Sequence, residues 1–254
     1  MTQAPTGGAG PSDRIAVHTH LWGFPVMIAV LDYGAGNLRS VAKALEAVGS
    51  PPAVTDDPAI IAAADGLVVP GQGSAVDSMR RLERTGLVEP IKQFVASGKP
   101  FLGVCLGEQL IFESSEEGEG VTCLGLLPGT VRRLPGGQKV PHIGWNSVNI
   151  VRDHPLLAGV PNGAHFYFVH SYYVDPADPA AVVGETEYGV RFASIVGQGN
   201  VFATQFHPEK SSEIGLLIYR NFARLCAEHA SALGSQLRAG SQPISQPASA
   251  VARV

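Results

Sequence analysis

The chain of 254 residues has little excess charge of either sign, because 18 Lys and Arg oppose 22 Asp and Glu and leave a net charge of −4. This balance excludes a protein that coats nucleic acid, and it does not indicate a polyphosphate partner. Apolar residues make up 45% of the sequence and charged residues 16%, which is typical of a folded globular chain. A chain of this length can form one α/β domain with a full core.

Cysteine is scarce, with only Cys105, Cys123 and Cys226. The three lie far apart, their number is odd, and no CxxC or Cys/His cluster has the spacing of metal ligands. We therefore expect no metal and no cofactor, and a reducing, cytoplasmic location.

Long hydrophobic runs are also missing. The longest apolar stretch near the start, residues 15–31, is interrupted by His18, His20 and Pro25, and no basic segment precedes it. It fits neither a membrane span nor a signal peptide. The two histidines have the i, i+2 spacing of a metal pair, but they stand in a segment with too little structural signal to support one.

The composition changes at both ends of the chain. Residues 1–26 are rich in Gly, Pro, Ala, Ser and Thr, so the fold is expected to begin at Met27. The segment before it is either a disordered extension or the result of a start codon assigned too early. Ala, Ser, Gln and Pro dominate the other end. The sequence thus predicts one domain over 27–233 and a disordered tail over 234–254.

Apolar runs and helical patterns alternate in the first half, which predicts a parallel sheet with helices on both faces. The expected strands there are 27–32, 66–70 and 100–104, and the expected helices are 38–48 and a segment from about Ala75. The second half has strand patterns with few helices between them, so the sheet should become mixed. These strands are expected at 129–134, 165–174, 181–185 and 201–206, followed by a helix over 213–229.

The strongest local signal is Gly103-Val-Cys-Leu-Gly107, a strand-to-helix turn of the form G-x-C-x-G. Glycines two residues on either side of a nucleophile relieve the crowding of a sharp turn, as in the elbow of α/β-hydrolases. The start of a helix favours a thiolate at Cys105, and the N–H of Leu106 would face a developing oxyanion. On this turn alone, Cys105 could equally be a small buried residue that ends a core strand.

A second motif, Phe206-His-Pro-Glu-Lys210, follows the last predicted strand. A thiol nucleophile needs a base, and the base needs a group that fixes its tautomer. His207 and Glu209 supply that pair. A solvated loop histidine beside a surface glutamate is the weaker explanation, because both motifs stand at carboxyl ends of strands, where open α/β sheets place their sites. The sequence therefore predicts a triad of Cys105, His207 and Glu209.

These motifs resemble the triad-type (class I) glutamine amidotransferases over most of the predicted domain. The resemblance includes the loop Pro70-Gly-Gln-Gly73 and the extended elbow Gly103-Val-Cys-Leu-Gly-Glu-Gln109. It implies one flavodoxin-like α/β domain that hydrolyses glutamine to glutamate and ammonia through a thioester. Finer features resemble the glutaminase subunits of imidazole glycerol phosphate synthases. They are Asp32-Tyr-Gly-Ala-Gly-Asn-Leu38, Pro141-His-Ile-Gly-Trp-Asn146, Tyr167-Phe-Val-His-Ser-Tyr172 and Lys210-Ser211.

The resemblance assigns further roles. It implies backbone oxyanion donors at Leu106, Gln72 and Gly73, and contacts to glutamine from Gln109, Glu117, Ser171 and Tyr172. Glu117 has another explanation, because it belongs to a run of four glutamates and most such runs are only solvated. Two residues depart from the family pattern. Glu108 stands where an apolar or histidine side chain is expected, and Gln72 stands where valine is commoner.

The chain has no evident synthetase domain, so its ammonia would need a partner. The resemblance implies a heterodimer with a (β/α)8-barrel cyclase subunit that forms imidazole glycerol phosphate and AICAR in histidine biosynthesis. It places the interface at Asn37, Ser40, His142, Trp145, Asn146 and Lys210. For His142, a packed strand with a satisfied histidine is the favoured alternative. Other open alternatives are a glutaminase subunit of anthranilate or aminodeoxychorismate synthase, a catalytically silent scaffold, and a cysteine peptidase.

Overall fold

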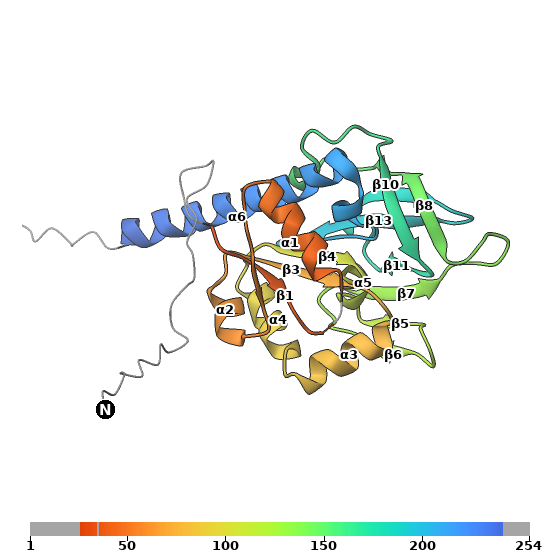
Figure 1. Cartoon of the computed structure of the whole chain (residues 1–254), viewed down its shortest axis with the longest axis horizontal. Coiled ribbons are helices and arrows are strands. Elements are labelled where there is room, and N and C mark those ends of the chain that lie inside the picture. The colour runs from red at the N-terminus through yellow and green to blue at the C-terminus, as the bar shows by residue number, and fades with distance from the viewer. Residues whose placement is uncertain (1–25, 35, 241–254) are drawn as a thin grey trace, which may run out of the picture.

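The computed structural model describes residues 26–34 and 36–240 of the chain (Figure 1). The predicted N-terminal extension, apart from Val26, therefore lies outside the described residues, and so do His18 and His20. The end of the predicted tail, residues 241–254, also lies outside them.

Helices and strands alternate through the first half, as the sequence predicts. The helices are α1 (Leu38–Ala47), α2 (Pro58–Ala63), α3 (Ala75–Arg84), α4 (Val88–Ala96), α5 (Leu106–Leu110) and α6 (Ser212–Gly240), with 3-10 turns η1 (Pro155–Leu157), η2 (Pro179–Ala181) and η3 (Pro208–Lys210). The strands of the first half are β1 (Ile28–Leu31), β2 (Ala53–Thr55), β3 (Gly66–Gly71) and β4 (Phe101–Cys105). Those of the second half are β5 (Ser114–Ser115), β6 (Val121–Thr122), β7 (Gly129–Arg133), β8 (His142–Ser147), β9 (Asn149–Ile150), β10 (His165–His170), β11 (Tyr172–Pro176), β12 (Val182–Glu187), β13 (Arg191–Gln198) and β14 (Val201–Thr204).

One large mixed sheet forms the centre of the fold. Its strand order is β2-β1-β3-β4-β14-β13-β11-β7-β5-β6, and the pairs from β2 to β14 are parallel. From β14 to β7 neighbouring strands run antiparallel, while β12 pairs with β13 and with β9. Strands β8 and β10 form a separate antiparallel pair. The prediction of a sheet that is parallel at first and mixed later is confirmed.

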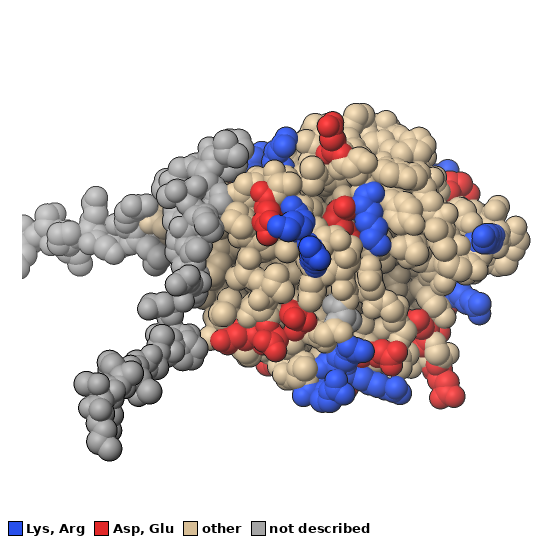
Figure 2. Space-filling view, viewed as in Figure 1, with Lys and Arg blue, Asp and Glu red and all other residues tan. Residues whose placement is uncertain are grey.

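Strands β1, β3, β4 and β14 are buried on both faces, which explains their continuous apolar runs. Along β1, Ile28 and Val30 pack with the residues of α1 and α6, whereas Ala29 and Leu31 pack with those of α2, α3 and α4. Figure 1 shows these two helical layers on opposite sides of the sheet. On the face seen in Figure 2, Lys and Arg lie beside Asp and Glu, in keeping with the small net charge.

Two boundaries differ from the sequence prediction. The single strand predicted over 165–174 is wrong, because the chain leaves one sheet at His170 and enters the other at Tyr172, with Ser171 between. The predicted helix end at His229 is also wrong, because α6 continues to Gly240. Its last residues had been assigned to a disordered tail on composition. Alanine, glutamine and leucine there also favour helix, and a preceding helix needs no new nucleation to continue into them.

The sequence prediction missed the short strands β2, β5, β6 and β9, and it also missed two longer strands, β8 and β13. Both contain glycine and polar residues, which weaken an alternating pattern. Among the described residues, no helix is both long and apolar enough to cross a membrane.

The packing of β3 against α6 generates a first prediction. A Cβ added to Gly66 would overlap the Cys226 sulfur and lie 3.3 Å from the ring of Phe222. We expect Gly66→Ala to lower the free energy of unfolding by about 1–3 kcal/mol through overpacking. Gly136→Ala is the control, because no atom lies within 4 Å of a Cβ added there. Urea unfolding measures both, and adding Cys226→Ala should recover part of the loss. Equal stability of the two glycine variants would contradict this packing.

Candidate active site

Three neighbouring parallel strands bring the predicted site together. Gly71 at the end of β3 lies beside Cys105 at the end of β4, and Thr204 at the end of β14 lies beside Val104. Since the carboxyl ends of parallel strands meet at one edge, the segments that follow them converge there. His207 comes directly after this edge, between β14 and η3.

Cys105 occupies a strained backbone conformation at this edge. Its φ is 55° and its ψ is −109°, a region that residues with a side chain rarely adopt. The surrounding glycines allow it. A Cβ on Gly103 would lie 2.7 Å from the carbonyl oxygen of Gly107, and a Cβ on Gly107 would overlap the carbonyl oxygen of Val69. The glycines therefore do more than relieve the turn, because they also let α5 pack directly on β3.

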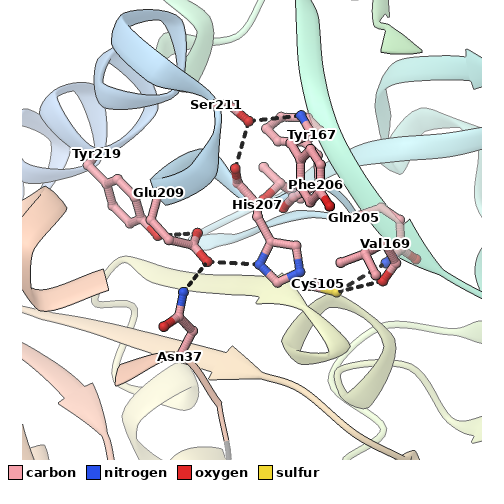
Figure 3. A network of polar contacts seen from close by, with 11 residues as sticks. Asn37, Cys105, Tyr167, Val169, Gln205, Phe206, His207, Glu209, Ser211 and Tyr219 are labelled. Carbon is pink, nitrogen blue, oxygen red and sulfur yellow. Dashed lines mark hydrogen bonds and ion pairs between the residues drawn. The ribbon is translucent and has the colours of Figure 1, made fainter. Parts of the chain in front are cut away.

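The side chains of His207 and Glu209 form a buried pair. Nδ1 of His207 is 2.8 Å from Oε1 of Glu209, and the two side chains are 2% and 1% exposed. Nε2 of His207 is buried without a conventional hydrogen bond within the described part of the chain, and it faces the sulfur of Cys105 (Figure 3). The three predicted triad residues are thus neighbours, in the order thiol, imidazole, carboxylate.

The charges of this cluster favour an ion pair. Burial alone would lower the pKa of His207, but the negative charge at the neighbouring Cys105 sulfur and the Glu209 carboxylate raise it to about 9. Burial alone would raise the pKa of Glu209, but its hydrogen bond to His207 and the charge of that ring keep it below the ordinary value. An imidazolium between two anions accounts for both the raised pKa of His207 and the lowered pKa of Glu209.

Further contacts hold the pair in place. Glu209 accepts hydrogen bonds from Nδ2 of Asn37 at 3.4 Å and from the hydroxyl of Tyr219 at 3.3 Å (Figure 3). The hydroxyl of Ser211 donates to the carbonyl oxygen of His207 at 2.6 Å and accepts from the N–H of Tyr167 at 3.0 Å. The loop after β14 is therefore fixed to both α6 and β10.

The thiol lines a pocket of about 380 Å³. Its lining is Gln72, Gly73, Cys105, Leu106, Gln109, Glu117, Pro141, Val169, His170, Ser171, Tyr172, His207 and Lys210. All residues predicted as oxyanion donors or substrate contacts are on this list. Segments far apart in the sequence thus converge on one cavity.

Glu117 is a pocket residue and more than one member of a solvated charge run. Its Oε2 accepts a hydrogen bond of 2.5 Å from the N–H of Ala75, the first residue of α3. The carboxylate therefore holds the start of α3, directly after the loop of Gln72 and Gly73, to the segment that carries Glu117. One carboxylate oxygen remains for a cation in the cavity.

The residues predicted for a partner interface fall into two groups. Trp145 is 52% exposed on β8 and its ring meets that of Tyr167 edge-on, with 6.2 Å between the centroids. The ammonium of Lys210 lies 5.9 Å from the same Tyr167 ring. Asn146 and Ser40 are half-buried on β8 and α1.

His142 and Asn37 point inward instead. His142 is 3% exposed and stacks on Tyr188, with 3.9 Å between the ring centroids. Burial lowers its pKa to about 4. Of the two interpretations of His142, the structure matches the satisfied core histidine. Asn37 contacts the triad carboxylate through its side chain.

Sequence reasoning missed several residues around the thiol. Nε2 of Gln205 donates to the Cys105 sulfur at 3.8 Å, and the thiol is 3.9 Å from the carbonyl oxygen of Val169. Gln205 is fully buried. A signal for it existed, since a glutamine that directly precedes the second motif interrupts a buried apolar strand and needs partners.

Glu108 has no such partners. It is fully buried in α5, and neither carboxylate oxygen has a hydrogen bond within the described residues. Burial, and then the charge of Cys105, raise its pKa well above the ordinary value. Burial therefore favours the neutral carboxyl over the carboxylate. The departure noted in the sequence is a buried acid beside the nucleophile.

Known proteins share this architecture. Residues 29–224 match the family model of class-I glutamine amidotransferases. The chain belongs to this family. The relatives include the imidazole glycerol phosphate synthase subunit HisH of Moorella thermoacetica, 53% identical over 78% of this chain and 94% of the relative. The HisH subunit of Aromatoleum aromaticum is 53% identical over 77% of this chain and 96% of the relative.

Solved structures agree on the fold of this amidotransferase. A glutamine amidotransferase structure aligns with a TM-score of 0.64 at 21% identity, over 79% of this chain and 98% of the other. PurLQS of Thermotoga maritima aligns with a TM-score of 0.60 at 20% identity, over 81% of this chain and 99% of the other. The class-I resemblance seen in the sequence is confirmed.

The ion pair predicts how His207 titrates. Because its pKa is raised to about 9, the stability from its pairing is present below its unfolded pKa of about 6.5 and is lost as the pH rises through 9. Glu209→Gln and Cys105→Ser each remove a neighbouring charge, so each should lower the pKa of His207. Ring chemical shifts measured by NMR against pH test this. A wild-type His207 that titrates as in the free amino acid and ignores both substitutions would contradict the ion pair.

The neutral acid in α5 predicts a stabilising substitution. The unfolded chain loses the proton of Glu108 above about pH 4.3 while the native chain keeps it, so its penalty grows with pH. We expect Glu108→Met to raise the free energy of unfolding by about 1–3 kcal/mol at pH 8, and by less at pH 5. The exposed Glu119, changed to Gln, should alter stability at neither pH. Urea unfolding at both pH values gives the comparison, and a destabilised Glu108→Met would argue for a hidden partner of the carboxyl.

Proposed function

We propose that the chain is the glutaminase subunit of an imidazole glycerol phosphate synthase, which hydrolyses L-glutamine and passes the ammonia to a cyclase subunit. The observation that carries the proposal is the thiol, imidazole and carboxylate series beside a pocket of about 380 Å³. Relatives at 53% identity that bear the synthase subunit name support the choice of acceptor.

The chemistry begins with the thiolate of Cys105, which attacks the side-chain amide carbon of glutamine. The proton held by His207 passes to the amide nitrogen, so ammonia leaves and a thioester remains. His207, now neutral, takes a proton from water, which attacks the thioester and releases glutamate. Glu209 keeps the ring in the orientation and tautomer that both steps need.

Both steps pass through an oxyanion. The N–H of Leu106, directly after the nucleophile, is one donor in the proposal, and the loop of Gln72 and Gly73 supplies the second. A donor of this kind contributes about 3–4 kcal/mol of transition-state stabilisation where it has been measured. The strained φ of Cys105 supports the first assignment, since the turn directs the next N–H toward the pocket end.

The far end of the pocket suits the amino-acid end of glutamine. The free oxygen of Glu117 would pair with the α-ammonium group, and the backbone at Ser171 and Tyr172 would bind the α-carboxylate. Gln109 lines the wall between these groups and the thiol. Such a clamp holds the amide carbon near the sulfur, which favours the first step by proximity.

The outer face near the pocket suits the partner. Trp145 is half exposed, and Lys210 reaches both the pocket and the ring of Tyr167. Exposed aromatic residues beside a cation are typical of protein interfaces. In this proposal the heterodimer forms in the cytoplasm and its cyclase subunit binds this face.

The decisive experiment measures glutamate release by the purified chain, with and without the cyclase subunit and its ribonucleotide substrate. We expect feeble activity alone and a strong rise with both. Cys105→Ala should abolish release in either case, and Trp145→Ala should raise the concentration of cyclase needed for half activation. Equal activity with and without the cyclase would overturn the pairing.

Labelling with a glutamine-mimicking electrophile separates the enzyme from a silent scaffold. An adduct on Cys105 that disappears in Cys105→Ala supports catalysis. No adduct in the wild type, at concentrations that label a known glutaminase, supports the scaffold.

A further inference from the structure

A continuous series of hydrogen bonds connects β8 to the nucleophile. It starts at Asn146, whose Nδ2 is 3.4 Å from Nε2 of His142. Nδ1 of His142 is 2.9 Å from Nε2 of His170, and Nδ1 of His170 is 2.8 Å from the carbonyl oxygen of Tyr172. These contacts cross from the separate β8–β10 pair into the large sheet.

The series continues from Tyr172 to the thiol. Nε2 of Gln109 donates to the Tyr172 carbonyl oxygen at 2.9 Å and to Oε1 of Gln205 at 3.0 Å. Gln205 in turn donates through Nε2 to the Cys105 sulfur at 3.8 Å. The Tyr172 carbonyl oxygen therefore accepts from both sides, as its two lone pairs allow.

The chemistry of the groups fixes the direction of each bond. A carbonyl oxygen can only accept, so Nδ1 of His170 carries the proton and its Nε2 must accept. The bond at that Nε2 then comes from Nδ1–H of His142, whose own Nε2 accepts from the Asn146 amide. Burial lowers the pKa of His142 to about 4 and that of His170 to about 3, so both rings are neutral, as this arrangement requires.

We propose that His142 and His170 are positioning residues of the glutaminase. They hold the Tyr172 carbonyl, and through it Gln109 and Gln205, in the arrangement that places an amide N–H on the sulfur of Cys105. Loss of the hydrogen bond between His142 and His170 removes the constraint that keeps the Tyr172 carbonyl aimed at Gln109. The same series connects β8 with the thiol, and its use by a bound cyclase rests on the proposed function.

Packing offers a competing role for His142. Its ring stacks on Tyr188 and on Phe168, with 5.0 Å between the centroids of His142 and Phe168. A phenylalanine at this position keeps the stacked ring but removes both hydrogen bonds. An asparagine keeps an amide donor in place of Nδ1–H but loses the ring. The two substitutions therefore separate the effect of the hydrogen bond to His170 from the effect of the stacked ring.

The test compares kcat, KM and urea stability of His142→Phe and His142→Asn in the full chain. If the bond positions the site, His142→Phe should lose kcat about tenfold, the effect of one hydrogen bond, with little change in stability. His142→Asn should recover most of that kcat and be the less stable of the two. A packing role predicts the opposite order for kcat, and that order would overturn the proposal, as would unchanged kcat in both.

His154→Phe is the matched control. His154 is a half-buried ring that contacts Phe202, and its Nδ1 accepts from the N–H of Leu156, outside the series. Its substitution should alter stability without the kcat pattern of His142. If either His142 variant fails to fold, His170→Phe and His170→Asn repeat the comparison, since an asparagine there can still donate to the Tyr172 carbonyl.

Adding the cyclase subunit and its ribonucleotide substrate tests the connection to β8. We expect His142→Phe and Asn146→Ala to show a smaller ratio of activated to basal kcat than the wild type. An unchanged ratio would overturn the use of this series by the partner. A wild type that the cyclase does not activate would overturn the proposed function instead, and the basal comparison of the His142 variants would still decide the positioning roles.

Discussion

The direct contact between α5 and β3 is the constraint on which the site depends. Only glycine at Gly71 and Gly107 permits it, because a Cβ at either would meet backbone or Cβ atoms of the other element at less than 3 Å, and Gly103 of β4 is held to glycine in the same way by the carbonyl of Gly107. The contact forces a sharp turn at Cys105 and turns the sulfur outward into the pocket. It also fixes the N–H of Leu106 relative to β3. The loop that follows β3, with Gln72 and Gly73, lines the same pocket.

Electrostatics then requires that the region around this sulfur contain one cation and little further charge. His207 supplies the cation, and Glu209 balances it behind the ring. A second anion beside the thiolate would oppose it, and Glu108 stands where such an anion would arise. Because its carboxyl is fully buried and has no hydrogen bond within the described residues, the neutral form is favoured, which lessens the repulsion on a thiolate at Cys105. Burial thus makes an acidic residue tolerable next to the nucleophile.

The sequence was sufficient to bring Cys105, His207 and Glu209 together as a candidate triad, because they stand in short motifs at the ends of predicted strands. Local spacing determines such arrangements. It was also sufficient for β1, β3, β4 and β14, where fully buried strands leave unbroken apolar runs, but not for the half-exposed parallel strand β2. It was insufficient for Gln205, Tyr219 and His170, whose roles depend on contacts between elements distant in the chain.

The end of α6 and the break at Ser171 were missed for different physical reasons. Composition alone could not tell whether an alanine-rich end continues a helix, since tertiary contacts and the preceding turn decide it. The run from His165 to Val174 has continuous strand character, and nothing local shows that its two halves pair with different sheets. Only the pairing partners β8 and β7, distant in sequence, reveal the crossing.

That crossing gives the second half of the fold its importance for catalysis. Strand β10 belongs to the outer pair that carries Trp145 on β8, whereas β11 belongs to the sheet that ends at the nucleophile. Between them, Ser171 and the carbonyl of Tyr172 line the pocket. Strand β10 is held by its pairing with β8, and β11 by its pairing with β7 and β13. A displacement of the β8–β10 pair relative to the large sheet must therefore change the backbone at Ser171 and Tyr172. The short segment that joins β10 to β11 thus also lines the pocket, which makes it the natural place for the outer face and the thiol to influence each other.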